Sequence, residues 1–287
     1  MVTASPHCLA FETKGAGYPI LCLHGHPGSA RSMAVFTDHL SRRFCTIAPD
    51  LRGYGNSRTA RDFTMADHLI DLEHLLDQQG IDRCLLLGWS LGGILAMELA
   101  LQHPHRVSGL ILIATAAYPR GNHPPISLAD NLCTGIAALL NWIQPGWQWN
   151  IETFGKRSLF RYLVQRHTPA TYRYIAAAAI PAYLQTSPQA TRALMTAIST
   201  GYNRLADLHQ IQCPTLVLAG ESDRHITAQS SQLTAQHLPN SELRVYPNVA
   251  HLFPWEIPTT VLHDIDQWIE KNLAAVTAQS PDQFHHG

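Results

Sequence analysis

Short apolar runs alternate along this chain with longer amphipathic stretches, and this rhythm limits its fold more than any other feature. Runs with the length of strands occupy residues 19–25, 44–51, 83–89, 107–116, 214–221 and 242–247. Most of them are apolar throughout instead of alternating, which is typical of parallel strands buried on both faces. The stretches between them have helical periodicity. The chain therefore predicts an α/β fold with a mostly parallel sheet flanked by helices.

The helical stretches carry recognisable start and stop signals. Thr64 and Asp67 have the spacing of a capping box, and Gly80 follows the end of the same stretch. The stretch that starts at Leu91 is expected to close at Pro104, because proline cannot continue a helix. A last periodic stretch covers residues 258–273. These signals favour helices in all three stretches.

The rhythm stops between residues 119 and 206, a segment rich in helix formers and aromatic residues. Unstructured loops of this length are rare in compact domains. We therefore predict a mainly helical insertion (residues 119–206) that forms a lid on a core made of residues 1–118 and 207–277. The polar residues 278–287 are expected to form a flexible tail.

Composition excludes several classes of protein. The 287 residues are 46% hydrophobic and carry a net charge of −1, which gives no general attraction to nucleic acid or an anionic membrane. No apolar run approaches the ~18 residues of a membrane span. The six cysteines are scattered, no basic and apolar leader is recognisable, and a reducing cytoplasm is the expected location. No H-E-x-x-H motif or Cys/His cluster points to a metal.

The sequence G-W-S-L-G at 88–92 joins a predicted strand directly to a predicted helix. This G-x-S-x-G pattern is typical of a nucleophile elbow, a turn so tight that glycine is needed on both sides of the serine. It would hold Ser90 at the tip of the strand. The N–H of Leu91, at the helix N-terminus, would then help to bind an oxyanion. The simpler interpretation is that the glycines only allow close packing of helix and strand.

Partners for a nucleophilic serine follow later in the chain. Asp223 comes directly after the run 214–221, and His251 follows the last strand-like run. A serine hydroxyl needs a base, and the base needs a carboxylate to hold its tautomer. All three residues lie at carboxyl ends of predicted strands, where open α/β sheets place their sites. Glu221 is the second candidate for the acid.

Several motifs together resemble the α/β-hydrolase fold superfamily in its lidded form. They are H-G-H-P-G at 24–28, D-L-R-G-Y-G-N-S at 50–57, G-W-S-L-G-G at 88–93, G-x-x-D at 220–223 and A-H at 250–251. The resemblance implies a catalytic triad of Ser90, Asp223 and His251. It also implies an oxyanion hole made by the backbone N–H groups of His26 and Leu91.

The same resemblance implies a serine hydrolase that cleaves a small carboxylic ester, or a thioester, through an acyl-enzyme without cofactor or metal. Serine at position 90 argues against the dehalogenase and epoxide hydrolase relatives, which use a carboxylate nucleophile, and H-G-H-P-G differs from the H-G-x-G-P-G loop of carbon–carbon bond hydrolases. A cofactor-free haloperoxidase-like perhydrolase and a small-molecule receptor with little turnover stay open. Residues 88–93 followed by residues 100–114 also resemble the pimeloyl-carrier-protein methyl ester esterase group, which makes a carrier-protein or coenzyme A ester an alternative substrate.

The insertion is expected to set the substrate. Trp89, Trp142 and Trp147 are candidates for the pocket wall, although aromatic residues of this kind also form the core of such insertions. Eight basic residues against two acidic ones give the insertion a net charge of +6. This excess would suit an acidic carrier or an anionic substrate, and a solvated basic face explains it more simply.

The remaining polar residues near these motifs have structural interpretations. Asp50 is expected to be structural, with Arg52 as its partner. The side chains of His24 and His26 are expected to shape their loop, and His225 to be solvated.

Overall fold

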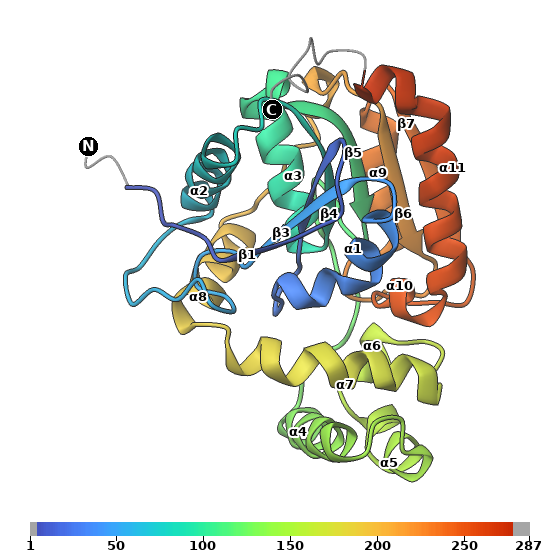
Figure 1. Ribbon diagram of the computed structural model, residues 1–287. Helices are drawn as coiled ribbons and strands as arrows, with labels where there is room; N and C mark the ends of the chain where they lie inside the picture. The colour runs from blue at the N-terminus through green and yellow to red at the C-terminus, as the bar shows by residue number, and fades with distance from the viewer. Residues whose placement is uncertain (1–4, 278–287) are drawn as a thin grey trace.

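A computed structural model describes residues 5–277, and the predicted tail at 278–287 lies outside the described residues. Seven strands form one sheet in the order β1-β3-β2-β4-β5-β6-β7 (Figure 1). Their bounds are β1 (Phe11–Lys14), β2 (Pro19–Leu23), β3 (Cys45–Pro49), β4 (Cys84–Trp89), β5 (Val107–Ile113), β6 (Thr215–Gly220) and β7 (Ser241–Tyr246). All neighbours pair in parallel except β1, which is antiparallel to β3. The predicted mostly parallel sheet is confirmed.

The edge strand β1 was not among the six predicted strands. Its sequence, F-E-T-K, is short and polar, and its side chains lie mostly exposed. It has neither the continuous apolar run of a central strand nor the alternation of a half-buried one. Backbone pairing with β3 therefore fixes it, through the register Phe11 to Pro49.

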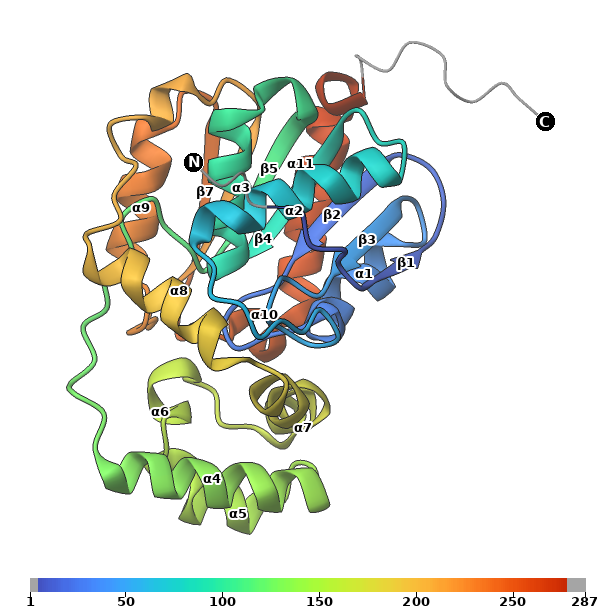
Figure 2. The same cartoon turned by 90° about the vertical axis from the view of Figure 1, so that its left-hand side faces the viewer.

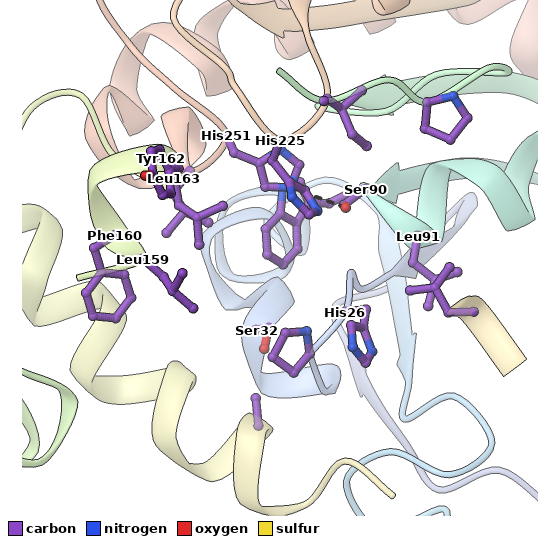
Figure 3. Close-up of a pocket in the computed structure, with 18 of the residues that line it drawn as sticks. His26, Ser32, Ser90, Leu91, Leu159, Phe160, Tyr162, Leu163, His225 and His251 are labelled. Carbon is purple, nitrogen blue, oxygen red and sulfur yellow. Dashed lines mark hydrogen bonds between the residues drawn. The ribbon is translucent and has the colours of Figure 1, made fainter. Parts of the chain in front are cut away.

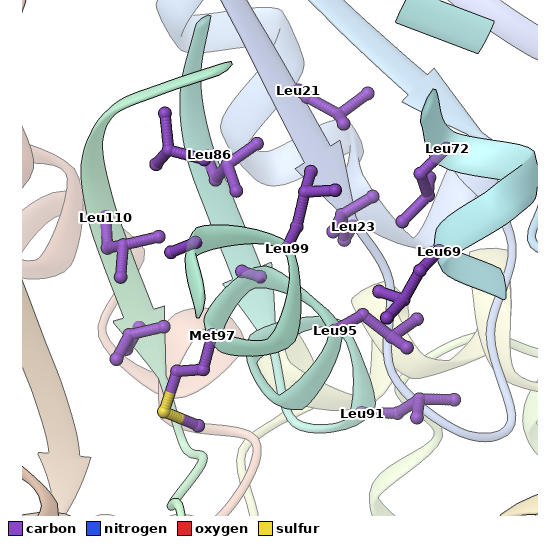
Figure 4. Packing of buried hydrophobic residues seen from close by; sticks show 14 of the residues in the cluster. Leu21, Leu23, Leu69, Leu72, Leu86, Leu91, Leu95, Met97, Leu99 and Leu110 are labelled. Atoms are coloured by element: carbon purple, nitrogen blue, oxygen red, sulfur yellow. The ribbon is translucent and has the colours of Figure 1, made fainter. Parts of the chain in front are cut away.

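Helices cover both faces of the sheet. One face packs against α2 (Met65–Gln78), α3 (Leu91–Gln102) and α9 (Ala228–His237), and Figure 4 shows Leu99 of α3 between Leu86 of β4 and Leu23 of β2. The other face packs against α1 (Ala34–Leu40), α10 (Phe253–Glu256) and α11 (Pro258–Thr277). Because successive strand residues point to opposite faces, Leu85 and Leu87 join the second core and Leu86 the first.

The helix signals read from the sequence are present. Thr64 and Asp67 form both hydrogen bonds of the capping box at the start of α2, and Gly80 adopts a φ of 63° just after its end. Helix α3 ends at Gln102, two residues before Pro104. Short 3₁₀ turns complete the loops at η1 (Ala30–Met33), η2 (Pro104–Arg106), η3 (Gly155–Arg157) and η4 (Leu208–Gln210).

The insertion is helical. It contains α4 (Leu128–Ile143), α5 (Gln148–Thr153), α6 (Phe160–Leu163), α7 (Pro169–Leu184) and α8 (Pro188–Ser199). Figures 1 and 2 show α4 and α5 farthest from the sheet, with α6 and α7 between them and the core. Helix α8 packs its Ala190 and Leu194 into the same core cluster as α2. No helix among residues 5–277 combines the length and the apolarity that crossing a membrane requires.

Helix α4 has an apolar face turned toward solvent. Leu128, Leu132, Leu139 and Trp142 are all exposed at helical spacing. Its opposite face is fixed by the buried Asn141, whose amide donates to the backbone carbonyl of Tyr172 in α7 (2.7 Å). The aromatic content of the insertion therefore does not point uniformly toward the core.

Candidate active site

The turn between β4 and α3 has the geometry of a nucleophile elbow. Ser90 adopts φ 54° and ψ −115°, a conformation that non-glycine residues rarely take. A Cβ at Gly88 would collide with the carbonyl oxygen of Gly92, and one at Gly92 with that of Leu23. The Ser90 N–H donates to the carbonyl of Ile113 (2.9 Å), which ties the turn to β5. The glycines are thus needed to hold Ser90 in this position.

Ser90, His251 and Asp223 come together at the carboxyl ends of their strands. His251 Nε2 lies 3.2 Å from Ser90 Oγ, although the two residues are 161 positions apart in the chain. His251 Nδ1 lies 2.8 Å from Asp223 Oδ2. Because a carboxylate only accepts, Nδ1 carries the proton and Nε2 is free to accept the hydroxyl of Ser90. All three side chains are buried.

The loop after β6 fixes the carboxylate of Asp223. Its Oδ1 accepts the backbone N–H groups of His225 (2.8 Å) and Ile226 (3.0 Å), which leaves Oδ2 for His251. Glu221, the other candidate acid, is exposed and accepts the N–H of Asn248 (3.3 Å). The geometry therefore pairs the histidine with Asp223.

The expected Asp50–Arg52 pairing is wrong. Both oxygens of Asp50 accept backbone N–H groups, from Ala30 (2.7 Å) and Asn56 (2.8 Å). Arg52 instead forms a two-point ion pair with the buried Asp71 of α2. The packing of α2 on the loop, which the sequence does not reveal, decides the partner.

His24 and His26 shape the loop after β2, as predicted. His24 donates from Nδ1 to the carbonyl of Gly25 (2.8 Å) and accepts the N–H of Leu51 at Nε2 (3.1 Å). His26 Nδ1 lies 2.9 Å from the hydroxyl of Tyr54. Burial lowers the pKa of both histidines to about 4, so both rings are neutral near pH 7.

His26 and Leu91, whose backbone N–H groups are predicted to bind an oxyanion, both line one cavity beside Ser90. Leu91 is the first residue of α3, so its N–H has no acceptor within the helix. Neither N–H donates a hydrogen bond to another group in the part of the chain that the structure describes.

That cavity lies between the core and the insertion and has a volume of about 590 Å³. Trp89 forms part of its wall, with its ring 4.7 Å from that of Trp255 and 5.8 Å from that of His251. Figure 3 shows Ser90 and His251 facing residues of α6 across the cavity. Its walls are mainly apolar, with side chains from α7 and α8 that include Ile175, Ala178, Ala182, Leu194, Met195 and Ile198.

The structure does not bring Trp142 and Trp147 to the cavity. Trp142 lies on the outward face of α4 with 58% of its surface exposed, and Trp147 contacts Trp149 (4.9 Å between ring centroids) on the outer layer of the insertion. Neither is among the residues that line the cavity. Trp142 and Trp147 lie farther from the core than Trp89 does, because α6 and α7 lie between α4 and the core.

The loop that carries His251 is fastened to the insertion. The N–H of Leu252 donates to the carbonyl of Leu163 at the end of α6 (2.8 Å). The carboxylate of Glu256 accepts the N–H groups of Gln165 (3.1 Å) and Arg166, and also that of Ala250 beside the histidine (2.9 Å). One set of hydrogen bonds thus holds both the loop of His251 and the segment 163–166.

His225 is exposed, as expected, and the structure also places it in the wall of the cavity. Its ring lies 4.8 Å from that of His251. The available signal was its place two residues after Asp223, in the turn that holds the carboxylate.

Comparison with known proteins agrees with this architecture. The chain is 26% identical over 257 residues to the pimeloyl-[acyl-carrier protein] methyl ester esterase of Nitrosomonas europaea, covering 84% of this chain and 91% of the relative. It is 28% identical over 262 residues to the 2-hydroxymuconate semialdehyde hydrolase of Pseudomonas putida, covering 87% of this chain and 86% of that protein.

A solved structure of a thermophilic esterase from Thermogutta terrifontis superposes with a TM-score of 0.67 at 28% identity, covering 92% of this chain and 93% of the other. The family model described as the alpha/beta hydrolase fold matches residues 18–258. The chain therefore belongs to the α/β-hydrolase fold family.

Proposed function

We propose that this α/β hydrolase is a serine esterase that cleaves a carboxylic ester, or a thioester, through an acyl-enzyme on Ser90. The observation that carries the proposal is the chain of contacts from Ser90 Oγ to His251 Nε2 (3.2 Å) and from His251 Nδ1 to Asp223 (2.8 Å). This is the arrangement that activates a serine hydroxyl at neutral pH.

In the proposed reaction, Ser90 Oγ attacks the ester carbonyl while His251 Nε2 takes its proton. The oxyanion of the tetrahedral intermediate accepts the N–H groups of Leu91 and His26. His251 then gives the proton to the leaving alcohol, and the acyl group stays on Ser90. A water molecule, deprotonated by His251, attacks the acyl-enzyme and releases the acid. Asp223 stabilises the imidazolium that forms twice in this cycle.

In the same proposal the insertion (residues 119–206) acts as a lid on the core of residues 1–118 and 207–277. Support comes from the cavity, because its wall combines Ser90 and His251 of the core with side chains of α6, α7 and α8. The apolar lining suits an uncharged acyl chain, since burying apolar surface is worth ~25 cal/mol per Å².

The test is labelling with a fluorophosphonate probe followed by mass spectrometry, together with turnover of p-nitrophenyl butyrate. The proposal expects labelling at Ser90, loss of labelling in Ser90→Ala and His251→Ala, and steady turnover by the unaltered protein. A stoichiometric burst that then stalls would favour a receptor, and no labelling of the folded protein would refute the activated serine.

A carrier-linked ester is the second candidate substrate. It is favoured by the similarity to the Nitrosomonas esterase and by the net charge of +6 on the insertion, which suits an acidic carrier. A comparison of kcat/KM for the methyl ester of an acyl-carrier-protein conjugate and for the same ester without carrier decides this, since a docking carrier must raise it. Equal values would leave the small ester as the substrate.

A further inference from the structure

The polar side chains in the wall of the cavity differ in whether they already have partners. His26 contacts the hydroxyl of Tyr54 (2.9 Å), Ser32 Oγ accepts the N–H of Ser29 (3.2 Å), and the hydroxyl of Tyr162 accepts a hydrogen bond from Arg161 (2.7 Å). No hydrogen bond to either ring nitrogen of His225 is found within residues 5–277. A polar group without a partner in a mainly apolar pocket is of the kind that orients a ligand.

His225 has neighbours on two sides. Its backbone N–H donates to Asp223 Oδ1, which joins it to the residue that orients the base. Its ring stacks on that of His123 (6.0 Å between centroids, planes within 8°), and His123 stacks in turn on Tyr162 of the insertion (5.4 Å). The residue is therefore anchored through its backbone on the core side, and its ring contacts a side chain of the insertion.

The position of His225 relative to the reaction follows from the path of the proton. His251 Nε2 protonates the leaving oxygen, so the alcohol part of the ester must lie within hydrogen-bond reach of that atom. The rings of His251 and His225 are 4.8 Å apart and meet edge to face, and Figure 3 shows the two side by side next to Ser90. A group one or two atoms beyond the leaving oxygen would meet His225.

We propose that His225 is a specificity-determining residue that binds a neutral hydrogen-bonding group, such as a hydroxyl or an amide, in the alcohol part of the ester. This inference rests on the proposed esterase function and names the substrate class that its site selects. The apolar side chains of α7 and α8 would accommodate the rest of the substrate.

The preference for a neutral group follows from the charge of the ring. Partial desolvation beside the cavity lining lowers the pKa of His225, and the neighbouring His251 and His123 lower it further than Asp223 raises it. A neutral imidazole offers one donor and one acceptor, which match a hydroxyl or an amide. It offers no cation to a carboxylate. The guanidinium of the adjacent Arg224 lies over the ring of Tyr162 (5.4 Å to the centroid), and Arg224 does not line the cavity.

The experiment compares three butyrate esters of similar size: the 2-hydroxyethyl ester, the propyl ester and the carboxymethyl ester. The unaltered protein is expected to prefer the hydroxyethyl over the propyl ester about tenfold in kcat/KM, the value of one well-placed hydrogen bond. His225→Phe keeps an aromatic ring and removes both nitrogens, so the two values should become equal within about twofold. His225→Asn, which keeps a donor and an acceptor, should retain part of the preference. His237→Phe, at an exposed position of α9, is the matched control and should retain all of it.

Three outcomes would overturn the inference. The unaltered protein does not distinguish the hydroxyethyl from the propyl ester, or His225→Phe keeps the full preference, or the carboxymethyl ester is the best substrate. In all three the propyl ester is still hydrolysed, so the esterase proposal survives. Absence of any ester turnover together with absence of labelling at Ser90 would instead refute the esterase proposal itself, and the inference with it.

Discussion

Replacement of Asp223 by asparagine should remove nearly all activity without unfolding the protein. The side chain has two different tasks, because Oδ1 accepts two backbone N–H groups and Oδ2 accepts His251 Nδ1–H. An asparagine has a single acceptor oxygen. If its NH₂ group faced the two N–H groups, both would lose their acceptor at a cost of roughly 1–3 kcal/mol each. The oxygen therefore takes the position of Oδ1, and the NH₂ group turns toward His251.

In this orientation of the amide, His251 is held in the tautomer that cannot accept the proton of Ser90. Facing a donor, Nδ1 must accept, so the proton moves to Nε2, which can no longer take the proton of Ser90. Reaching the productive state requires turning the amide and abandoning both N–H groups, which costs roughly 2–6 kcal/mol. Since 1.36 kcal/mol is tenfold in rate, kcat should fall by a factor between about 30 and about 3 × 10⁴.

The assay is steady-state turnover of p-nitrophenyl butyrate, with circular dichroism and the thermal midpoint as measures of folding. Glu221→Gln is the matched control, because Glu221 contacts Asn248 and not the histidine. It should change kcat less than about threefold. If Asp223→Asn kept more than a tenth of the activity, or if Glu221→Gln lost as much as it did, the pairing of His251 with Asp223 would not be the working one.

Three further predictions concern stability. In Asp71→Ala the buried Arg52 loses its nearest carboxylate and keeps Asp67 at 3.5 Å and the carbonyl of Ser5 at 3.3 Å, so urea unfolding should show a loss of about 3 kcal/mol, and a loss below ~1 would contradict the burial of the pair. Gly135→Ala, at a position of α4 with open space around it, should raise the free energy of unfolding by ~0.5–1 kcal/mol, and a lowered thermal midpoint would speak against it. Burial lowers the pKa of His68 to about 3, so its unfolded state binds a proton below pH ~6.5 while the folded state does not, and stability is lost as the pH falls. Between pH 7 and 5 this share is roughly 2 kcal/mol, and His68→Phe should reduce the measured pH dependence by that amount, whereas an unchanged slope would show that His68 is protonated in the folded state.

The features that the sequence predicted are those decided by neighbours in the chain. The elbow at Ser90 depends on glycines two residues away, and the cap at Thr64 on a carboxylate three residues away. Strand β4 was predictable because a central parallel strand is apolar on both faces. Strand β1 was not, because its pairing with β3 and not its own composition holds it.

The features that were missed depend on how distant elements pack. Arg52 meets Asp71 because α2 lies over its loop, and Trp142 faces solvent because α7 takes the opposite side of α4. Helical periodicity shows that a helix has an apolar face, but not whether that face turns toward the core or toward solvent. The stacking of His225 on His123 likewise depends on how the insertion packs against the core.

The hydrogen bonds between the His251 loop and residues 163–166 couple the positions of these two segments. Leu252 and Glu256 hold the end of α6 by three backbone groups, and Glu256 also holds Ala250 next to the histidine. Moving the segment 163–166 away from the core would displace the loop that holds His251 beside Ser90. We therefore expect the contact between His251 and Ser90 to persist only while these hydrogen bonds to residues 163–166 are intact.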